Sequence, residues 1–319
     1  MKMLDRKTVL AFACVLAAGA VQGADSPPDW AYPVNPPGFK PKPDDGTPRH
    51  VPGSNASFTL TQLRDRFFSP VWHPGEHPAQ PEVVARGRKP DVFACGFCHR
   101  ADGPGGPENS NLAGLPAAYI AQQMADYKSG ARKTSVPGRN IDLMISLAKA
   151  ATDAEIEAAA AYFSALKTRA VVRVVESDSV PRTYVTGWHF AAMGKGEQEA
   201  LGQRIIEMPE VFEHFESRDT HARFVAYVPP GSIEKGRALA TTGGGKTVQC
   251  ASCHGPELKG VGAIPALAGR SPTYLVRQLY DFKHGARKGA ESPQMKPTVE
   301  NLAIEDMIAL GAYVASLAP

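Results

Sequence analysis

The chain has 319 residues, of which 43% are hydrophobic and 21% charged, and its formal net charge is +3. This length allows two or three domains. The nearly balanced charge and the lack of a basic tract argue against a nucleic-acid-binding protein. The function therefore has to be sought in the motifs.

Residues 1–24 have the pattern of a cleaved secretory signal peptide. Lys2, Arg6 and Lys7 precede an apolar run from Val9 to Val21, and small residues follow it. The run is shorter than the ~20 residues that span a bilayer. Loss of this segment would lower the net charge to about +1. We predict export to the periplasm.

Residues 25–81 are rich in proline and aromatic residues. Each proline removes a backbone donor and restricts the residue before it, so long helices are excluded here. We predict an extended arm laid over the rest of the protein, with one short helix from Thr59 to Phe68. Three histidines of this arm, His50, His73 and His77, are predicted to be solvated or packed rather than to act as ligands.

Two copies of the motif C-x-x-C-H are the strongest signal in the chain. This pattern is typical of c-type haem attachment, in which two thiols add to the haem vinyl groups and the histidine binds the iron. The residues are Cys95, Cys98 and His99 in the first copy, and Cys250, Cys253 and His254 in the second. The sequence therefore predicts two covalently bound haem c groups.

A lone C-x-x-C could also be half of a zinc site or a redox-active dithiol. A zinc site would need a second Cys or His pair nearby, and neither copy has a second Cys pair. A dithiol would not require a histidine directly after the second cysteine, twice. The chain has five cysteines. If Cys14 leaves with the signal peptide, the two motifs use all the others.

Residues that follow the first motif recur after the second motif. The spacing between the two copies is the same as that between Cys95 and Cys250. Leu112-Ala113-Gly114 matches Leu267-Ala268-Gly269, and the stretch 126–133 matches 281–288. Repetition on this scale indicates duplicated domains, which we place at 82–166 and 231–319. At this size a polypeptide core is marginal, so a covalently held haem would complete it.

Helices are predicted at four places in these domains. The first opens the first domain at 82–87 and leads into the attachment motif. An apolar face over 117–129 carries Ile120, Met124 and Tyr127, and Thr152 with Glu155 forms a capping box before an alanine-rich helix. The second domain is expected to end with a helix over 304–317. Tyr119 and Tyr274 are expected to pack between helices.

The segment 167–230 has no counterpart in the other half of the chain. Short strands are predicted at 170–175, 182–186 and 224–228, and 206–218 is either loop or helix. We predict a partly β bridge that fixes the two haem domains relative to each other. Its candidate iron ligands, His189, Met193, His214 and His221, are predicted to be ordinary surface or packing residues, because no second copy shares them.

Two methionines are candidates for the sixth iron position. Met144 corresponds to Met295 in the repeat, and each precedes its terminal helix by the same distance, whereas Met124 corresponds to Leu279 and is expected in the core. We predict Met144 and Met295 as distal ligands. A thioether ligand raises the reduction potential and suits a carrier, whereas an open position would allow ligand or peroxide chemistry.

The motifs, the stretch 265–269, Met295 with Pro297, and the closing helices resemble class I cytochromes c. The tandem arrangement is similar to di-haem cytochrome c4. This resemblance covers both haem domains but neither the arm nor the insert, and it implies a mainly α fold. It also implies that the carbonyl of Pro265 accepts the Nδ1–H of His254. The first domain departs from this pattern, because Ser110 stands where Pro265 stands in the second domain. The reduction potential of the first haem is therefore expected to differ from that of the second.

Arg132-Lys133 and Arg287-Lys288 recur beside each haem motif. One interpretation is that Arg132 and Arg287 each bind a haem propionate, a geometry that a guanidinium suits. The other interpretation is a solvated helix end.

The sequence predicts an electron carrier rather than an enzyme, with no catalytic residue assigned. It would pass electrons from a respiratory donor, such as a dehydrogenase or a membrane-associated quinol-oxidising complex, to a terminal oxidase or reductase. One alternative is a di-haem enzyme, a peroxidase or small-molecule dehydrogenase, in which one iron lacks methionine. Another is a cytochrome subunit docked to a dehydrogenase through the arm and the insert.

Overall fold

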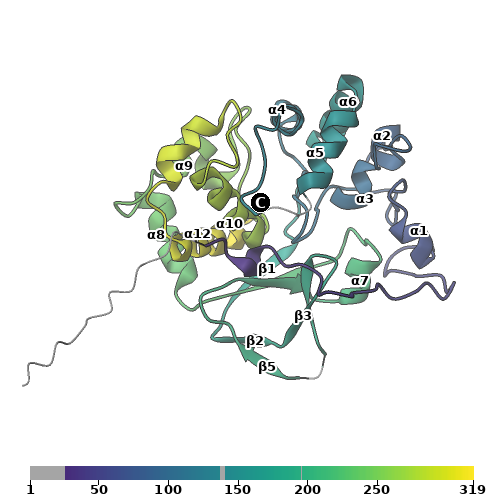
Figure 1. Cartoon of the computed structure of the whole chain (residues 1–319), viewed down its shortest axis with the longest axis horizontal. Helices are drawn as coiled ribbons and strands as arrows, with labels where there is room; N and C mark the ends of the chain where they lie inside the picture. The colour runs from purple at the N-terminus through teal and green to yellow at the C-terminus, as the bar shows by residue number, and fades with distance from the viewer. Residues whose placement is uncertain (1–25, 137–140, 195) are drawn as a thin grey trace, which may run out of the picture.

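The computed structural model describes residues 26–136, 141–194 and 196–319. The predicted signal peptide, 1–24, lies outside the described residues. Figure 1 shows two groups of helices side by side, with the strands of the insert beneath them and the C-terminus between them. None of the helices within the described ranges is long and apolar enough to cross a membrane.

The helices of the arm and the first haem domain are η1 (Asp29–Ala31), α1 (Leu60–Arg64), α2 (Glu82–Ala85), α3 (Cys95–His99), α4 (Ala117–Ser129), α5 (Ile141–Ala150) and α6 (Asp153–Ser164). The insert contains β1 (Val172–Glu176), β2 (Ser179–Pro181), β3 (Thr183–Thr186), β4 (His189–Ala192), β5 (Gln198–Ala200), β6 (Ile206–Pro209), α7 (Phe212–Glu216) and β7 (Phe224–Val228). The second haem domain contains α8 (Ser232–Thr242), α9 (Ala251–His254), η2 (Pro256–Leu258), α10 (Pro272–Lys283), η3 (Ser292–Met295), α11 (Lys296–Val299) and α12 (Ile304–Ser316).

In the first haem domain, α4 packs against both α5 and α6. Helix α4 has the predicted bounds, and the capping box before α6 is complete, with Thr152 and Glu155 each satisfying the other's backbone N–H. The buried side chains between these helices include Ile120 and Phe163. Helix α5, which carries Met144, is an element that the sequence analysis did not identify.

In the second haem domain, α8 and α12 pack closely and α10 crosses α12. Gly236 permits this approach, because a Cβ at that position would lie 1.9 Å from the carbonyl oxygen of Ala309. Helix α12 ends one residue before the predicted position. The core of this domain contains Val276, Met307 and Leu310.

The insert forms a three-stranded sheet and two small ribbons. Strand β7 is central, parallel to β1 and antiparallel to β6. The predicted strands correspond to β1, β3 and β7, while the stretch 206–218 contains both β6 and α7. Strands β3 and β4 join through Gly187 and Trp188, both at positive φ, as a two-residue type I′ hairpin turn requires.

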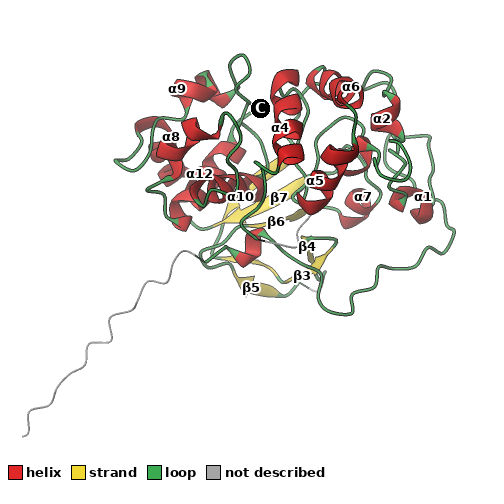
Figure 2. Ribbon diagram, turned by 45° about the horizontal axis from the view of Figure 1, so that its top comes forward, coloured by secondary structure: helices red, strands yellow, loops and turns green. Residues whose placement is uncertain are grey.

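The insert contacts both haem domains. Ile205 and Val228 belong to the same core as the second domain's Val276. On the other side, the Arg218 guanidinium donates to the carbonyl of Phe97, inside the first haem motif, at 2.6 Å. Figure 2 shows the strands gathered beneath both helical groups.

The arm is extended apart from η1 and α1, as its proline content predicts. Its Ala31 carbonyl accepts a hydrogen bond from Arg277 of α10 at 3.0 Å. Farther along, the buried indole of Trp72 donates to the carbonyl of Ser217 in the insert at 2.8 Å. The arm therefore contacts the second domain at its start and the insert near its end.

Candidate haem sites and the interface between them

The first C-x-x-C-H motif folds as the short helix α3, and its histidine is fixed by a backbone carbonyl. His99 is buried, and its Nδ1 lies 2.9 Å from the carbonyl oxygen of Ser110. Because a carbonyl can only accept, Nδ1 carries the proton and Nε2 keeps its lone pair. Burial lowers the pKa of His99, so the imidazole is neutral at neutral pH. This is the form of histidine that binds a metal.

The second motif repeats this geometry. His254, at the end of α9, has its Nδ1 2.8 Å from the carbonyl oxygen of Pro265. Burial lowers the pKa of His254 as well. The carbonyl of Pro265 therefore lies where the resemblance implied. The replacement of proline by Ser110 in the first domain keeps the hydrogen bond.

The first cysteine of each motif has the wrong acidity for a redox-active dithiol. Burial raises the pKa of Cys95 to about 12 and that of Cys250 to about 11. A redox dithiol reacts through a thiolate, which forms where the pKa is lowered. Thioether attachment to a haem makes no such demand.

An apolar cavity adjoins the first motif and tests whether a haem fits there. His99 and both motif cysteines line it on α3, and Met124 and Met144 line it from α4 and α5. Its other lining residues are mostly apolar and include Val83, Val92, Ile120, Leu147, Ala159 and Phe163. Because protein interiors are normally close-packed, such an apolar space beside two thiols and a neutral imidazole fits a haem.

Both methionines of the first domain reach this cavity. Met144 was the predicted distal ligand and Met124 a predicted core residue, and the structure places the two on neighbouring helices of one wall. In the second domain, Met295 ends η3, is half-buried, and packs on the same core as Cys250. Met144 thus lines the same cavity as His99, and Met295 packs against the core that Cys250 also contacts.

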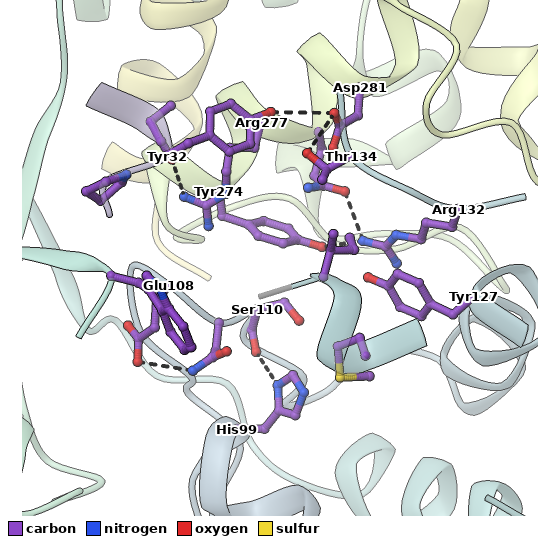
Figure 3. Close-up of a pocket in the computed structure, with 17 residues that line it drawn as sticks. Tyr32, His99, Glu108, Ser110, Tyr127, Arg132, Thr134, Tyr274, Arg277 and Asp281 are labelled. Carbon is purple, nitrogen blue, oxygen red and sulfur yellow. Dashed lines mark hydrogen bonds between the residues drawn. The ribbon is translucent and has the colours of Figure 1, made fainter. Parts of the chain in front are cut away.

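A second, more polar cavity lies between the two haem domains and also reaches His99 (Figure 3). Glu108 and Tyr127 line it from the first domain, and Tyr274 and Asp281 line it from α10 of the second. Residues of the arm and the insert complete the wall, including Tyr32 and Trp188. Met144 lines this cavity too, so the apolar and the polar cavity meet beside the first haem site.

Arg132 lies in this interface and binds across it. Its guanidinium donates to the hydroxyl of Tyr274 and to Oε1 of Gln278, both at 2.9 Å, and to Gln123 of its own domain at 2.8 Å. Burial alone would raise the pKa of Tyr274, but Arg132 and Arg287 outweigh it and hold this pKa below its usual value. The tyrosine hydroxyl therefore accepts from a full positive charge.

Arg287, in the second domain, makes the equivalent contacts with the first domain. It donates to the hydroxyl of Tyr119 at 2.8 Å and to Gln123 at 2.9 Å, both in the first domain, and to Gln278 of its own domain at 3.1 Å. Arg132 and Arg287 are both buried. The interpretation of a solvated helix end is therefore wrong, because each arginine is covered by the other domain.

Tyr119 and Tyr274 were expected only to pack between helices, and their hydroxyls instead hold the two domains together. Gln123 and Gln278 were not singled out from the sequence at all. The signal was present, since both are identical residues at corresponding positions of the repeat. The Nε of Arg132 has no hydrogen-bond partner among the described residues, which leaves one donor free beside the cavity of His99.

The helices, the two fixed histidines and the apolar cavity define a class, the c-type cytochromes. A family model for cytochrome c matches residues 84–167 and 233–318, which are the two helical domains. The chain belongs to the cytochrome c family.

Several known proteins are similar to this chain. The chain is 30% identical over 203 residues to a thiosulfate dehydrogenase electron acceptor of Thiomonas intermedia, covering 63% of this chain and 67% of that one. It is 25% identical over 258 residues to cytochrome c4 of Azotobacter vinelandii, covering 76% and 91%. Among solved structures, reduced cytochrome c4 from Pseudomonas stutzeri matches with a TM-score of 0.46 and 23% identity, covering 70% and 93%. The chain is a di-haem, cytochrome c4-like protein with two covalently bound haem c groups.

Proposed function

We propose that this protein is a periplasmic electron carrier that receives electrons from a dehydrogenase or another respiratory donor and passes them to a terminal oxidase or reductase. The observation that carries this proposal is the placement of the two haem domains against each other. The cavity beside His99 is lined in part by residues of the other domain, Tyr274 and Asp281. The first redox site thus borders the second haem domain.

When bound, each haem supplies an iron that changes between the ferrous and ferric states. The chain's own residues keep the structural change between those states small. The Ser110 and Pro265 carbonyls fix the two imidazole rings, and we assign Met144 and Met295 as the sulfur ligands opposite them. The apolar lining of the first cavity excludes water, and a low dielectric with a thioether ligand favours ferrous iron.

We further propose that Arg132 and Arg287 place positive charge beside the haem propionates while they hold the domains together. The free Nε of Arg132 supports this role for the first domain. The arm and the insert, which have no counterpart in the family match, would fix the two domains relative to each other. Their contacts with both halves of the chain support this assignment.

Thiosulfate dehydrogenase is the donor to test first, because a relative is named as its electron acceptor. Oxidised holoprotein is mixed with the dehydrogenase and thiosulfate, and haem reduction is followed by absorbance. A carrier is expected to accept two electrons per protein, and to stay oxidised with thiosulfate alone. Reduction by thiosulfate alone would contradict the carrier and support the di-haem enzyme.

Carbon monoxide binding gives an independent test of whether the protein is an electron carrier or a di-haem enzyme. Ferrous holoprotein with methionine on both irons is expected to show no spectral change with carbon monoxide. Binding at one haem would mean an open sixth position, as the enzyme alternative requires. Isolation of the chain as a stable complex with a dehydrogenase would instead favour the role of a bound subunit.

A further inference from the structure

Two histidines and an aspartate outside both haem motifs meet where the arm contacts the insert. They are His73 of the arm, and Asp219 and His221 of the loop that follows α7. One potential ligand atom from each lies within 4.8 Å of the other two. His73 Nε2 is 3.2 Å from Asp219 Oδ1, and the rings of His73 and His221 are stacked with centroids 3.8 Å apart.

Asp219 is the unusual member of this group. It is 2% exposed, and its Oδ2 has no hydrogen-bond partner among the described residues. Nδ1 of His214 lies 3.6 Å from that oxygen, which is too long for a hydrogen bond. A buried carboxylate oxygen without a partner is costly, and a cation would satisfy it.

The group opens to solvent on one side, where a second carboxylate lies. Glu76 Oε2 is 2.8 Å from His221 Nε2 and also accepts from Arg169 at 2.7 Å. The side chains of Glu76 and His221 are about two-fifths exposed, whereas His73 and Asp219 are buried. This arrangement provides an entry path and a candidate fourth ligand.

We propose that His73, Asp219 and His221 form a site for a divalent transition metal, with Zn²⁺ as the best fit. Two imidazoles and a carboxylate are ligands that Zn²⁺ binds at about 2.0–2.2 Å, usually in tetrahedral geometry. Ligand atoms at those distances lie roughly 3.5 Å apart, and here they lie within 4.8 Å of one another, so binding draws them together. The imidazoles of His73 and His221 are stacked, so one ring turns on binding until both lone pairs point at the ion. Glu76 or a water molecule supplies the fourth ligand.

Such an ion would tie the arm to the insert beside the first haem domain. Trp72, next to His73, already donates to Ser217, and Arg218, next to Asp219, donates to Phe97 in the first haem motif. The ion would therefore hold fixed a loop that contacts the haem attachment helix. This inference does not depend on the proposed electron donor or acceptor.

The test uses untagged holoprotein freed of metals with EDTA and titrated with ZnCl₂ by calorimetry. One equivalent of Zn²⁺ is expected to bind, and H221A is expected to weaken this binding at least about tenfold, because His221 is a direct ligand. H50A is the matched control, since His50 is an exposed histidine of the same arm, and it should bind as wild type. Unchanged haem spectra show that each variant is folded.

X-ray absorption at the zinc edge gives a second readout that the haem irons do not disturb. The zinc-loaded protein is expected to show two imidazole ligands with nitrogen or oxygen neighbours at about 2.0–2.1 Å. The proposal is overturned if wild type binds no Zn²⁺, if H221A binds as tightly as wild type, or if H50A abolishes binding.

Discussion

Arg132 and Arg287 lie opposite each other in an isolated antiparallel bridge between the two haem domains. The backbone N–H of Lys133 donates to the carbonyl of Ala286, and that of Lys288 donates to the carbonyl of Ala131, both at 2.8 Å. Each arginine then reaches a tyrosine of the other domain. The internal repeat is therefore also a two-fold contact, in which one patch pairs with its own duplicate.

The contact between Arg132 and Tyr274 should contribute measurably to stability. Tyr274→Phe removes a buried acceptor and leaves a charged donor without its partner, so the free energy of unfolding is expected to fall by about 1–3 kcal/mol. Urea unfolding of the holoprotein, followed by circular dichroism, measures this. In R132A the same tyrosine change should have little further effect, because its partner is gone. Equal effects of Y274F in both backgrounds would contradict the contact.

The contact between the two haem domains can also be tested at Gly289, where they approach closely. A Cβ there would lie 1.9 Å from Oδ2 of Asp126, in the other haem domain. Gly289→Ala is expected to destabilise the protein by about 1–3 kcal/mol, since either the buried Asp126 carboxylate leaves its hydrogen bonds with Gln122 and Gln123 or the interface shifts. Gly75→Ala is the control, because nothing lies within 4 Å of its added Cβ. A Gly289→Ala variant as stable as the control would show that the domains sit farther apart.

The two methionines beside the first haem site are distinguished by spectroscopy. Met144→Ala is expected to halve the far-red absorption band that a thioether ligand gives to ferric haem, because one of two irons loses its sulfur. Met124→Ala removes the other thioether that lines the same cavity and should leave the band unchanged. The reverse result would assign Met124 as the ligand. Met295→Ala should remove the half that belongs to the second domain.

Acid should reveal the ion pair that fixes α6. The side-chain hydrogen bond from Arg88, followed by the Thr152 cap, lowers the pKa of Glu155 to about 2. Because the folded pKa lies below the unfolded one, this contribution is complete above about pH 4.5 and is lost as the pH falls towards 2. Glu155→Gln should cost roughly 0.5–1 kcal/mol at pH 6, since Arg88 is half exposed, and this cost should shrink as the pH falls through 2.

A constant difference between Glu155→Gln and wild type from pH 6 to pH 2 would contradict this assignment. Urea unfolding at each pH gives the comparison.

Structural features that depend on residues close together in the chain could be predicted from the sequence. The capping box at Thr152, the bounds of α4 and the strand β7 all follow from residue types within a few positions. The haem motifs add the identity of His99 and His254. The role of these two histidines follows from the cysteines that precede them in the motif.

Features that depend on distant parts of the chain could not be predicted in this way. The sequence left Arg132 between a propionate-binding role and a solvated helix end, because its partner Tyr274 is 142 positions away. His73 was predicted to be solvated or packed, and its partner Asp219 could not be named because it comes from the insert. Tertiary contacts between duplicated or unrelated segments decide these positions, and no local periodicity reports them.

The central claim is that two haems are bound, each with a histidine nitrogen and a methionine sulfur on its iron. The most direct measurement is the far-red band of the ferric holoprotein, scaled to the haem content found by intact-protein mass spectrometry. The account predicts two covalent haems and a band with the intensity of two sulfur-ligated irons per chain. A single haem, or a band of half that intensity or less, would contradict it.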